Sequence, residues 1–363
     1  MPPISVMIKP VSGACNLRCR YCFYTDIMNR RETKIHPRMT LETLETTVRR
    51  VMAYADDAAV FVLQGGEPTL IGLPFLEALV KFQRKYNPRG IRITNALQTN
   101  GYDLPDDMIK FFVREDFLLG VSLDGDCAAH DAMRVSPDGR GTFARVRANI
   151  DRLEQAGAAY NILCVVNDHV TQRTEETLDL LFQFGHLQLI ACLDELDGTK
   201  RGYSLTDAGY LSFLKAAFDR YEAAYRAGRP VSIRNFDNYV GMLMGCPPEN
   251  CAMGGRCSHQ LVVESDGSVY PCDFYVLDEW RCGNINQSGV RKLLKSDAAT
   301  QFIQPSLHVP DKCRACRWYG LCRNGCRRER DPETGLNRWC NVMQAFFEYS
   351  GERMLRMARE LGA

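Results

Sequence analysis

Short apolar runs alternate with amphipathic stretches from Ser5 to about Arg226, and this alternation constrains the fold more than any other feature of the sequence. The runs recur at intervals of roughly thirty residues, which is typical of βα units. Six such units favour an α/β fold, a parallel sheet curled into a partial TIM-like barrel, although an open doubly wound sheet has the same periodicity. The predicted strands are Ser5–Ile8, Val60–Leu63, Ile91–Ala96, Leu118–Ser122, Asn161–Val166 and Leu187–Cys192.

Helix start signals lie between these strands. Thr40 has the properties of an N-cap and precedes apolar residues at helical spacing, and Thr142 similarly opens a helix. The longest predicted helix runs from Thr206 to about Ala227, and a glycine follows it. A last amphipathic helix is expected at about 341–360.

The βα rhythm stops after Val231, and the composition changes there. Ten of the 16 cysteines lie between Cys246 and Cys340, among many glycine and polar residues. Such a segment has few long apolar runs, so metal ligation is expected to supply part of its folding energy. We therefore predict a barrel domain over residues 1–230 and a cysteine-rich domain over 231–363.

The charge balance and the cysteine content restrict the function and the compartment. Lys and Arg number 45 against 44 Asp and Glu, so nothing indicates disorder or an electrostatically bound nucleic acid. The first ten residues contain no apolar signal segment, and no later stretch is long and apolar enough to span a membrane. These features predict a cytoplasmic protein, whose clustered thiols stay reduced and bind metal more often than they form disulfides.

The first chemical pattern is Cys15-x3-Cys19-x2-Cys22, directly after the first predicted strand. Three thiolates on one loop can hold three irons of a cubane cluster and leave the fourth iron open for chemistry. A structural zinc site would need a fourth ligand, and none lies nearby. The spacing alone leaves zinc and chance as alternatives.

The segment Gln64-Gly-Gly-Glu-Pro68 follows the second predicted strand. Two adjacent glycines let the backbone approach a ligand closely, although an isolated pair is more often a tight turn. Here the glycines and the cysteine loop both lie at carboxyl ends of strands, where βα folds place their active sites.

With this cysteine spacing, an aromatic residue before the third cysteine and the GGEP segment, the chain resembles the radical S-adenosylmethionine superfamily. The resemblance implies that Cys15, Cys19 and Cys22 bind a [4Fe–4S] cluster whose open iron is chelated by S-adenosylmethionine. It also implies cofactor contacts from Tyr21, Gly66, Ser122, Arg134 and Leu193. By their local sequence alone, the last three are a strand cap, a surface arginine and a core leucine.

The second cysteine pattern lies in the C-terminal segment. Its eight cysteines divide into two closed four-thiolate sites, and two zinc sites would satisfy the same count. The spacings resemble the SPASM domain, which implies two further [4Fe–4S] clusters and three in all. The resemblance assigns Cys251, Cys257, Cys272 and Cys326 to one cluster and Cys313, Cys316, Cys322 and Cys340 to the other. A fully ligated cluster is better suited to passing electrons than to binding a substrate, which indicates an oxidation.

Five cysteines lie outside this set of eleven ligands: Cys127, Cys164, Cys192, Cys246 and Cys282. Buried packing is expected for Cys164 and Cys192, which fall in predicted strands. Cys246 lies close enough to Cys251 to compete as a ligand.

The stretch Val262–Val276 contains Asp273 directly after Cys272, and it resembles the corresponding segment of anaerobic sulfatase-maturating enzymes. The resemblance extends over most of the chain and implies that Asp273 is the catalytic base. Taken alone, an aspartate in a loop is more often solvated. Tyr24 and Gln98 are expected to line the peptide site. Two stretches, Asp124–His130 and Asp194–Tyr203, depart from the pattern of that family.

The sequence thus predicts a radical enzyme that oxidises a Cys or Ser of an unfolded sulfatase polypeptide to Cα-formylglycine. In the reaction that the resemblance implies, a 5′-deoxyadenosyl radical removes a hydrogen from Cβ, Asp273 accepts a proton and an auxiliary cluster takes the electron. The low-potential electron donor would be a flavodoxin or a ferredoxin. Alternatives are a SPASM enzyme that forms thioethers or other crosslinks in a ribosomally made peptide, and a non-catalytic electron carrier.

Overall fold

The computed structural model describes residues 3–362, which form two compact units. The first unit contains the described residues up to 122 together with 133–160 and 259–302, and the second contains 123–132, 161–258 and the residues from 303 onward. Each unit therefore takes residues from both sides of position 230. The division of the chain into domains at that position stays a prediction.

The first unit is built on a sheet of seven strands in the order β10-β9-β8-β1-β2-β3-β4. The strands β8, β1, β2, β3 and β4 run parallel to one another, whereas β9 is antiparallel to both of its neighbours, β8 and β10. Their bounds are β1 Ile4–Ile8, β2 Ala58–Leu63, β3 Arg92–Thr99, β4 Phe117–Ser122, β8 Leu261–Val263, β9 Ser268–Tyr270 and β10 Gly283–Asn284. From β1 to β4 the order in space follows the order in the chain, without the reversal of a doubly wound sheet.

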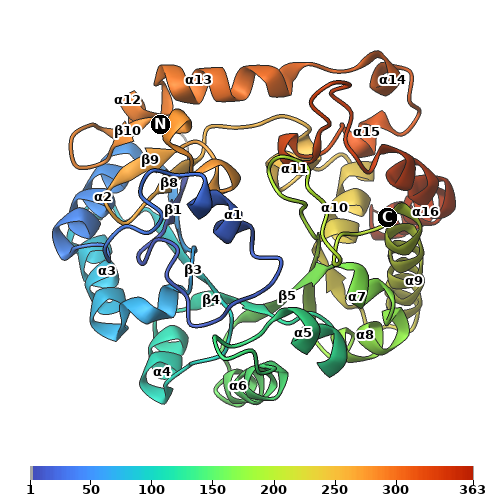
Figure 1. The fold of residues 1–363 in the computed structure, drawn as a ribbon, viewed down its shortest axis with the longest axis horizontal. Coiled ribbons are helices and arrows are strands. Elements are labelled where there is room, and N and C mark those ends of the chain that lie inside the picture. The colour runs from blue at the N-terminus through green and yellow to red at the C-terminus, as the bar shows by residue number, and fades with distance from the viewer. Residues whose placement is uncertain (1–2, 363) are drawn as a thin grey trace. The chain divides into compact units, whose positions relative to one another are not determined.

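Helices lie outside these strands, as the blue and teal part of Figure 1 shows for α2 (Leu41–Tyr54), α3 (Leu73–Lys85) and α4 (Asp106–Arg114). The predicted cap of α2 is confirmed, because the Thr40 side chain accepts a hydrogen bond from the Thr43 N–H at 3.1 Å. Thr142 also precedes a helix, α6 (Phe143–Gln155), but its hydroxyl donates to the Arg134 carbonyl at 2.7 Å instead of capping the helix.

The second unit contains the parallel strands β5 (Tyr160–Val166), β6 (His186–Ala191) and β7 (Ser232–Ile233), in that order. The helix α9 (Asp207–Arg226) packs on the last helix, α16 (Cys340–Gly362). Their contact has an apolar part, where Phe218 and Phe346 lie edge to face, and a polar part, where Arg353 donates a hydrogen bond to Asp219 at 2.7 Å.

The remaining elements are short. They are α1 Phe23–Asn29, η1 Pro68–Ile71, α5 Cys127–Met133, α7 Asp168–Thr171, α8 Thr174–Leu181, α10 Arg234–Leu243, α11 Cys251–Gly254, η2 Asp273–Tyr275, η3 Asp278–Trp280, α12 Val290–Leu294, α13 Asp297–Ile303, η4 Gln304–Leu307, α14 Asp311–Arg314, α15 Tyr319–Cys322 and η5 Arg327–Glu329.

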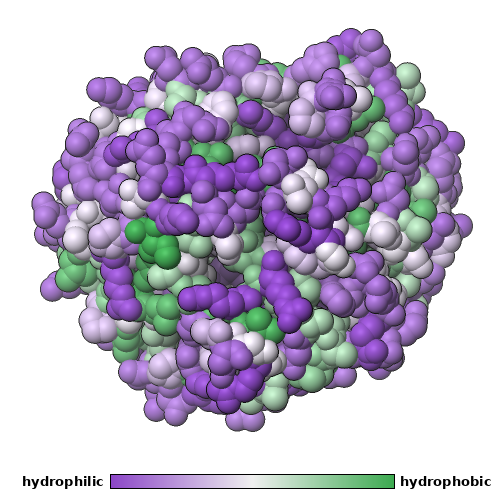
Figure 2. Space-filling model, viewed as in Figure 1, coloured by the Kyte–Doolittle hydropathy of each residue, from purple (hydrophilic) through white to green (hydrophobic). Residues whose placement is uncertain are grey.

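The face drawn in Figure 2 is mostly hydrophilic, with apolar residues in scattered patches. Among the described residues, no helix has the length and apolar character needed to cross a membrane.

Candidate active site and cysteine clusters

The three N-terminal cysteines lie on the loop between β1 and α1. The Cys22 N–H donates to the Cys19 carbonyl at 3.2 Å, which closes a tight turn just before α1 begins. Burial raises the pKa of the Cys15 thiol, and the nearby Glu67 carboxylate and Cys22 thiol raise it further. Cys15 and Cys22 are therefore close neighbours.

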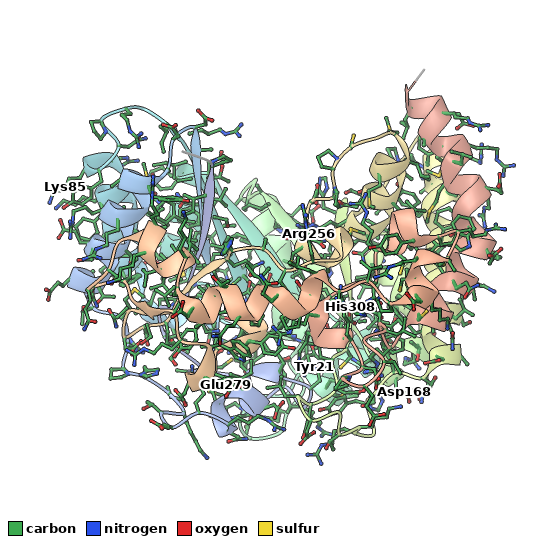
Figure 3. The ribbon with its side chains drawn as sticks, turned by 90° about the horizontal axis from the view of Figure 1, so that it is seen from above. Tyr21, Lys85, Asp168, Arg256, Glu279 and His308 are labelled. Atoms are coloured by element: carbon green, nitrogen blue, oxygen red, sulfur yellow. The ribbon has the colours of Figure 1, made fainter. Side chains whose placement is uncertain are left out.

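A second segment of the same unit holds this loop in place. The Arg18 N–H donates to the Val135 carbonyl at 2.7 Å and the Arg20 N–H to the Met133 carbonyl at 2.9 Å. Between these backbone bonds, the Arg134 guanidinium donates to the Tyr21 hydroxyl at 2.7 Å. Tyr21, labelled in Figure 3, lies in the turn between Cys19 and Cys22. Two predicted cofactor contacts, Tyr21 and Arg134, are thus brought together.

The Gly-Gly loop after β2 docks on the cysteine loop. Gly66 has a φ of +57°, and a Cβ at this position would lie 2.1 Å from the Ala14 carbonyl oxygen. The same oxygen accepts the Glu67 N–H at 2.8 Å. Only glycine fits here, because the backbone approaches the residue before Cys15 so closely.

Glu67 ties the end of β2 to the end of β3. Its buried carboxylate accepts hydrogen bonds from the Thr69 hydroxyl at 2.8 Å, the Thr99 hydroxyl at 2.9 Å and the Asn100 N–H at 2.7 Å. Burial raises the pKa of Glu67, and these bonds oppose that shift. The GGEP segment is therefore fixed by its own glutamate.

Two further predicted residues meet at the ends of β3 and β4. The Gln98 amide donates to the Ser122 hydroxyl at 3.1 Å, so a predicted peptide contact and a predicted cofactor contact are direct neighbours. Leu193 belongs to the second unit, where it follows β6 and is half-buried.

The Asp273 side chain is buried in the first unit and accepts three hydrogen bonds. Lys9 Nζ lies 2.9 Å from Oδ1, whereas the Tyr24 hydroxyl lies 2.5 Å and Gln64 Nε2 3.1 Å from Oδ2. Burial and the Asp273 carboxylate raise the pKa of Tyr24 well above its usual range, so the phenol stays a donor. We call these four residues the Asp273 network.

Two members of the Asp273 network, Lys9 and Gln64, received no role from the sequence. Gln64 is the first residue of the Gly-Gly segment, and its position at the end of a strand could have indicated that it belongs to the site. Lys9 follows directly after the apolar strand β1 and is 2% exposed. A single lysine at such a position gives no local sign that it is buried.

The C-terminal cysteines of the second unit form two groups. Burial and the Glu329 carboxylate raise the pKa of Cys326 to about 12, with smaller contributions from its neighbours Cys251 and Cys257. Burial raises the pKa of Cys322 to about 11, with contributions from its neighbours Cys340, Cys313 and Cys316. Cys272, the fourth member of the first predicted set, lies in the first unit, directly before Asp273.

This arrangement fits the iron–sulfur groups that the sequence implies. Ligand sets made only of cysteine sulfur suit iron–sulfur clusters. The close approach of Gly66 to the Ala14 carbonyl keeps the N-terminal cysteine loop compact. In the described part of the chain, no three His, Cys, Asp or Glu side chains converge tightly enough to hold a single ion. Thiolates on a cluster bind different irons instead.

The five remaining cysteines differ in burial. Cys164 and Cys192 are buried, as predicted, Cys282 is half-buried, and Cys127 and Cys246 are exposed. None of the 16 cysteines, all of which lie within the described residues, forms a disulfide bond.

Two protein-family profiles match parts of this chain. Residues 10–181 match the radical SAM superfamily, and residues 251–317 match SPASM, an iron–sulfur cluster-binding domain.

Curated relatives extend the similarity over the whole chain. The cysteine-type anaerobic sulfatase-maturating enzyme of Clostridium novyi is 41% identical, and the alignment covers 99% of each sequence. The serine-type enzyme of Klebsiella aerogenes is 30% identical over 95% of this chain and 84% of its own.

A solved structure described as native anSMEcpe with bound AdoMet and Cp18Cys peptide has a TM-score of 0.94. It is 40% identical, and the match covers 99% of this chain and 100% of that one. The α/β partial barrel with a C-terminal SPASM domain is thereby confirmed, and the open doubly wound sheet is excluded.

Proposed function

The chain belongs to the anaerobic sulfatase-maturating enzymes of the radical SAM superfamily, and on that premise we propose that it oxidises a cysteine of an unfolded sulfatase polypeptide to Cα-formylglycine. The observation that carries the proposal is the Asp273 network. In this network, three donors form hydrogen bonds to a buried carboxylate. The carboxylate belongs to the same compact unit as the loop that carries Cys15, Cys19 and Cys22.

When bound, the cofactors supply the 5′-deoxyadenosyl radical that removes a hydrogen atom from Cβ and the fully ligated clusters that accept the remaining electron. Cys15, Cys19 and Cys22 would hold the cluster that binds S-adenosylmethionine. The pairing of Tyr21 with Arg134 and of Gln98 with Ser122 supports a shared cofactor and peptide site in the first unit. Gly66, in the same unit, is a further proposed cofactor contact, whereas Leu193 of the second unit is proposed from the family resemblance alone.

In this proposal, Asp273 accepts the proton that leaves the thiol of the target cysteine. A carboxylate offers about four lone-pair positions, and the network uses three of them, so acceptor capacity remains. Loss of a hydrogen atom from Cβ, a proton from sulfur and one electron gives a thioaldehyde. Water then replaces the sulfur, which leaves as hydrogen sulfide, and the aldehyde of formylglycine results. Tyr24 lines the peptide side of this site.

Three [4Fe–4S] clusters per chain are part of the proposal. The mutual proximity of Cys313, Cys316, Cys322 and Cys340 supports one fully ligated cluster. The proximity of Cys251, Cys257 and Cys326 supports three ligands of the other. Only the sequence pattern assigns Cys272 as its fourth ligand.

Two further parts of the proposal concern the substrate and the electron donor. The identity to the cysteine-type relative, 41%, exceeds the 30% to the serine-type one, which supports cysteine as the target. A low-potential flavodoxin or ferredoxin would reduce the enzyme, because cleavage of S-adenosylmethionine consumes an electron.

The test is anaerobic turnover of a sulfatase-like peptide that contains Cys-x-Pro-x-Arg, followed by mass spectrometry. We expect a formylglycine in place of the cysteine, together with 5′-deoxyadenosine and sulfide. The matched peptide with alanine at the target position should give no aldehyde. A crosslinked peptide in place of the aldehyde would refute the proposed reaction while keeping the chain a radical enzyme.

A further inference from the structure

Lys9 lies directly after β1, and backbone bonds to both neighbouring strands fix its position. Its own N–H donates to the Val263 carbonyl of β8 at 2.8 Å, and the Gln64 N–H donates to the Ile8 carbonyl at 3.0 Å. The Lys9 side chain is only 3% exposed. A buried ammonium group needs a partner, because loss of hydration is costly for a charge.

The partner of Lys9 is Asp273, 264 positions away in the sequence, and the contact is specific to one carboxylate oxygen. Lys9 bonds to Oδ1, whereas Tyr24 and Gln64 bond to Oδ2. The ammonium group also lies 3.8 Å from the centroid of the Tyr24 ring. Donors on both oxygens fix the rotation of the carboxylate, and Lys9 is the donor on Oδ1.

Gly65 leaves the space that the lysine occupies. Its φ is +104°, and a Cβ there would lie 2.7 Å from Lys9 Nζ and 2.9 Å from its Cε. Any larger residue would therefore displace the ammonium group, and at this φ it would also strain the backbone. The two glycines of the loop thus have different neighbours, since Gly66 faces Ala14 and Gly65 faces Lys9.

We propose that Lys9 is a positioning residue for the reaction, which fixes the orientation of the Asp273 carboxylate, and that Gly65 keeps open the space it needs. This inference rests on the proposed function. A purely stabilising role is a weaker explanation, because an apolar residue of similar size often stabilises a buried site as well as an ion pair does. The orientation of the carboxylate decides which lone pairs face the target thiol.

The test compares the wild type with Lys9→Met and Gly65→Ala as reconstituted holoenzymes, by counting formylglycine formed per 5′-deoxyadenosine released. A merely unstable variant loses both products in proportion, so its ratio stays constant. We expect this ratio to fall about tenfold or more in both variants, because small displacements of a reacting group have large effects on rate. Lys9→Arg, which keeps the charge and the donors, should restore part of the ratio.

Arg31→Met is the matched control. Arg31 is also 3% exposed and pairs with a buried carboxylate, that of Glu264 at 2.8 Å, instead of Asp273. It lines the same small cavity as Lys9 and Tyr24. This variant should lose stability and keep the wild-type ratio.

A wild-type ratio in folded, iron-loaded Lys9→Met would overturn the inference and leave the proposed function intact. If Lys9→Met fails to take up iron, the product ratio of Gly65→Ala is used instead, and a wild-type ratio in that variant would likewise overturn the inference. Failure of both variants to take up iron would make Lys9 a purely structural residue, which also overturns the inference. A wild-type enzyme that makes no formylglycine would instead refute the proposed function.

Discussion

The chemistry of Asp273 depends on three residues that precede it by more than two hundred positions. An aspartate next to a cysteine in a loop is ordinarily solvated, and the sequence around it does not identify the donors that a buried carboxylate needs. Its side chain is 8% exposed only because Lys9, Tyr24 and Gln64 supply donors for a charge that has lost its water.

Asp273→Asn should retain cleavage of S-adenosylmethionine while formylglycine formation falls by about 100-fold or more, since general base catalysis typically contributes 10²–10⁴. The variant should also be less stable by roughly 3–5 kcal/mol, because Lys9 is left buried without its carboxylate. Deoxyadenosine and peptide aldehyde are measured in the same anaerobic reaction. Undiminished aldehyde would exclude Asp273 as the base.

Cys192 predicts a pH dependence of stability. Burial, with the Asp124 and Asp194 carboxylates nearby, raises its pKa from 9.0 to about 12. The unfolded chain therefore loses this proton at lower pH than the folded chain, and stability falls as pH rises above about 9.

The measurement for Cys192 is the difference in unfolding free energy between the wild type and Cys192→Ala. The cavity in the variant costs the same at every pH, so the advantage of the wild type should shrink by about 1 kcal/mol between pH 8 and pH 10. An advantage that stays constant over this range would contradict the shift.

At the scale of elements, the cysteine loop and the Gly-Gly loop form one assembly at the carboxyl ends of β1 and β2. Gly66 contacts the Ala14 carbonyl, and the Glu67 carboxylate joins the same loop to β3. The loops are neighbours because their parallel strands are neighbours in register, with Ile8 opposite Leu63.

Gly66→Ala should displace the cysteine loop, because the new Cβ would lie 2.1 Å from the Ala14 oxygen. We expect the loss of about four irons per chain and of deoxyadenosine formation. Gly90→Ala is the control, since Gly90 has a similar φ of +65° with no atom within 4 Å of a Cβ. Equal iron content in the two variants would show that the close approach is unimportant.

At the scale of the whole molecule, two compact units share the cysteines, and the chain passes between them several times. The cysteine-rich parts of the second unit contain short helices and 3-10 turns. Metal binding can supply folding free energy to such segments, so removal of iron should destabilise the protein as well as inactivate it.

Iron analysis after anaerobic reconstitution should give about twelve irons per chain. Cys322→Ala should lose about four of them, because Cys322 neighbours Cys313, Cys316 and Cys340. Cys246→Ala should keep all of them, since Cys246 is exposed and outside both groups of thiols in the second unit. A wild-type content near four irons, with zinc bound, would defeat the assignment of three clusters.

Local patterns predicted the elements well. All six expected strands exist, although β3 ends at Thr99, three residues later than predicted, and Thr40 caps its helix. These features depend on residues close together in the chain, so periodicity and capping chemistry suffice to find them. The cysteine spacings likewise indicated the metal sites, because ligands on one loop are local too.

The sequence could not reveal that the C-terminal half adds strands to the first sheet. β8 lies parallel to β1, with Met7 opposite Val262, and the chain then leads through β9 to Asp273. This pairing is what brings the aspartate to Lys9, and nothing within either segment specifies the other.

The amino-acid sequence by itself therefore determined the βα elements, the sulfur-rich ligand sets and the positions of the two glycines. Only the tertiary structure decided which charges share a buried site, such as Lys9 with Asp273. The physical reason is that a strand's periodicity follows from its own residues, whereas the stability of a buried charge depends on a partner that only long-range strand pairing brings near.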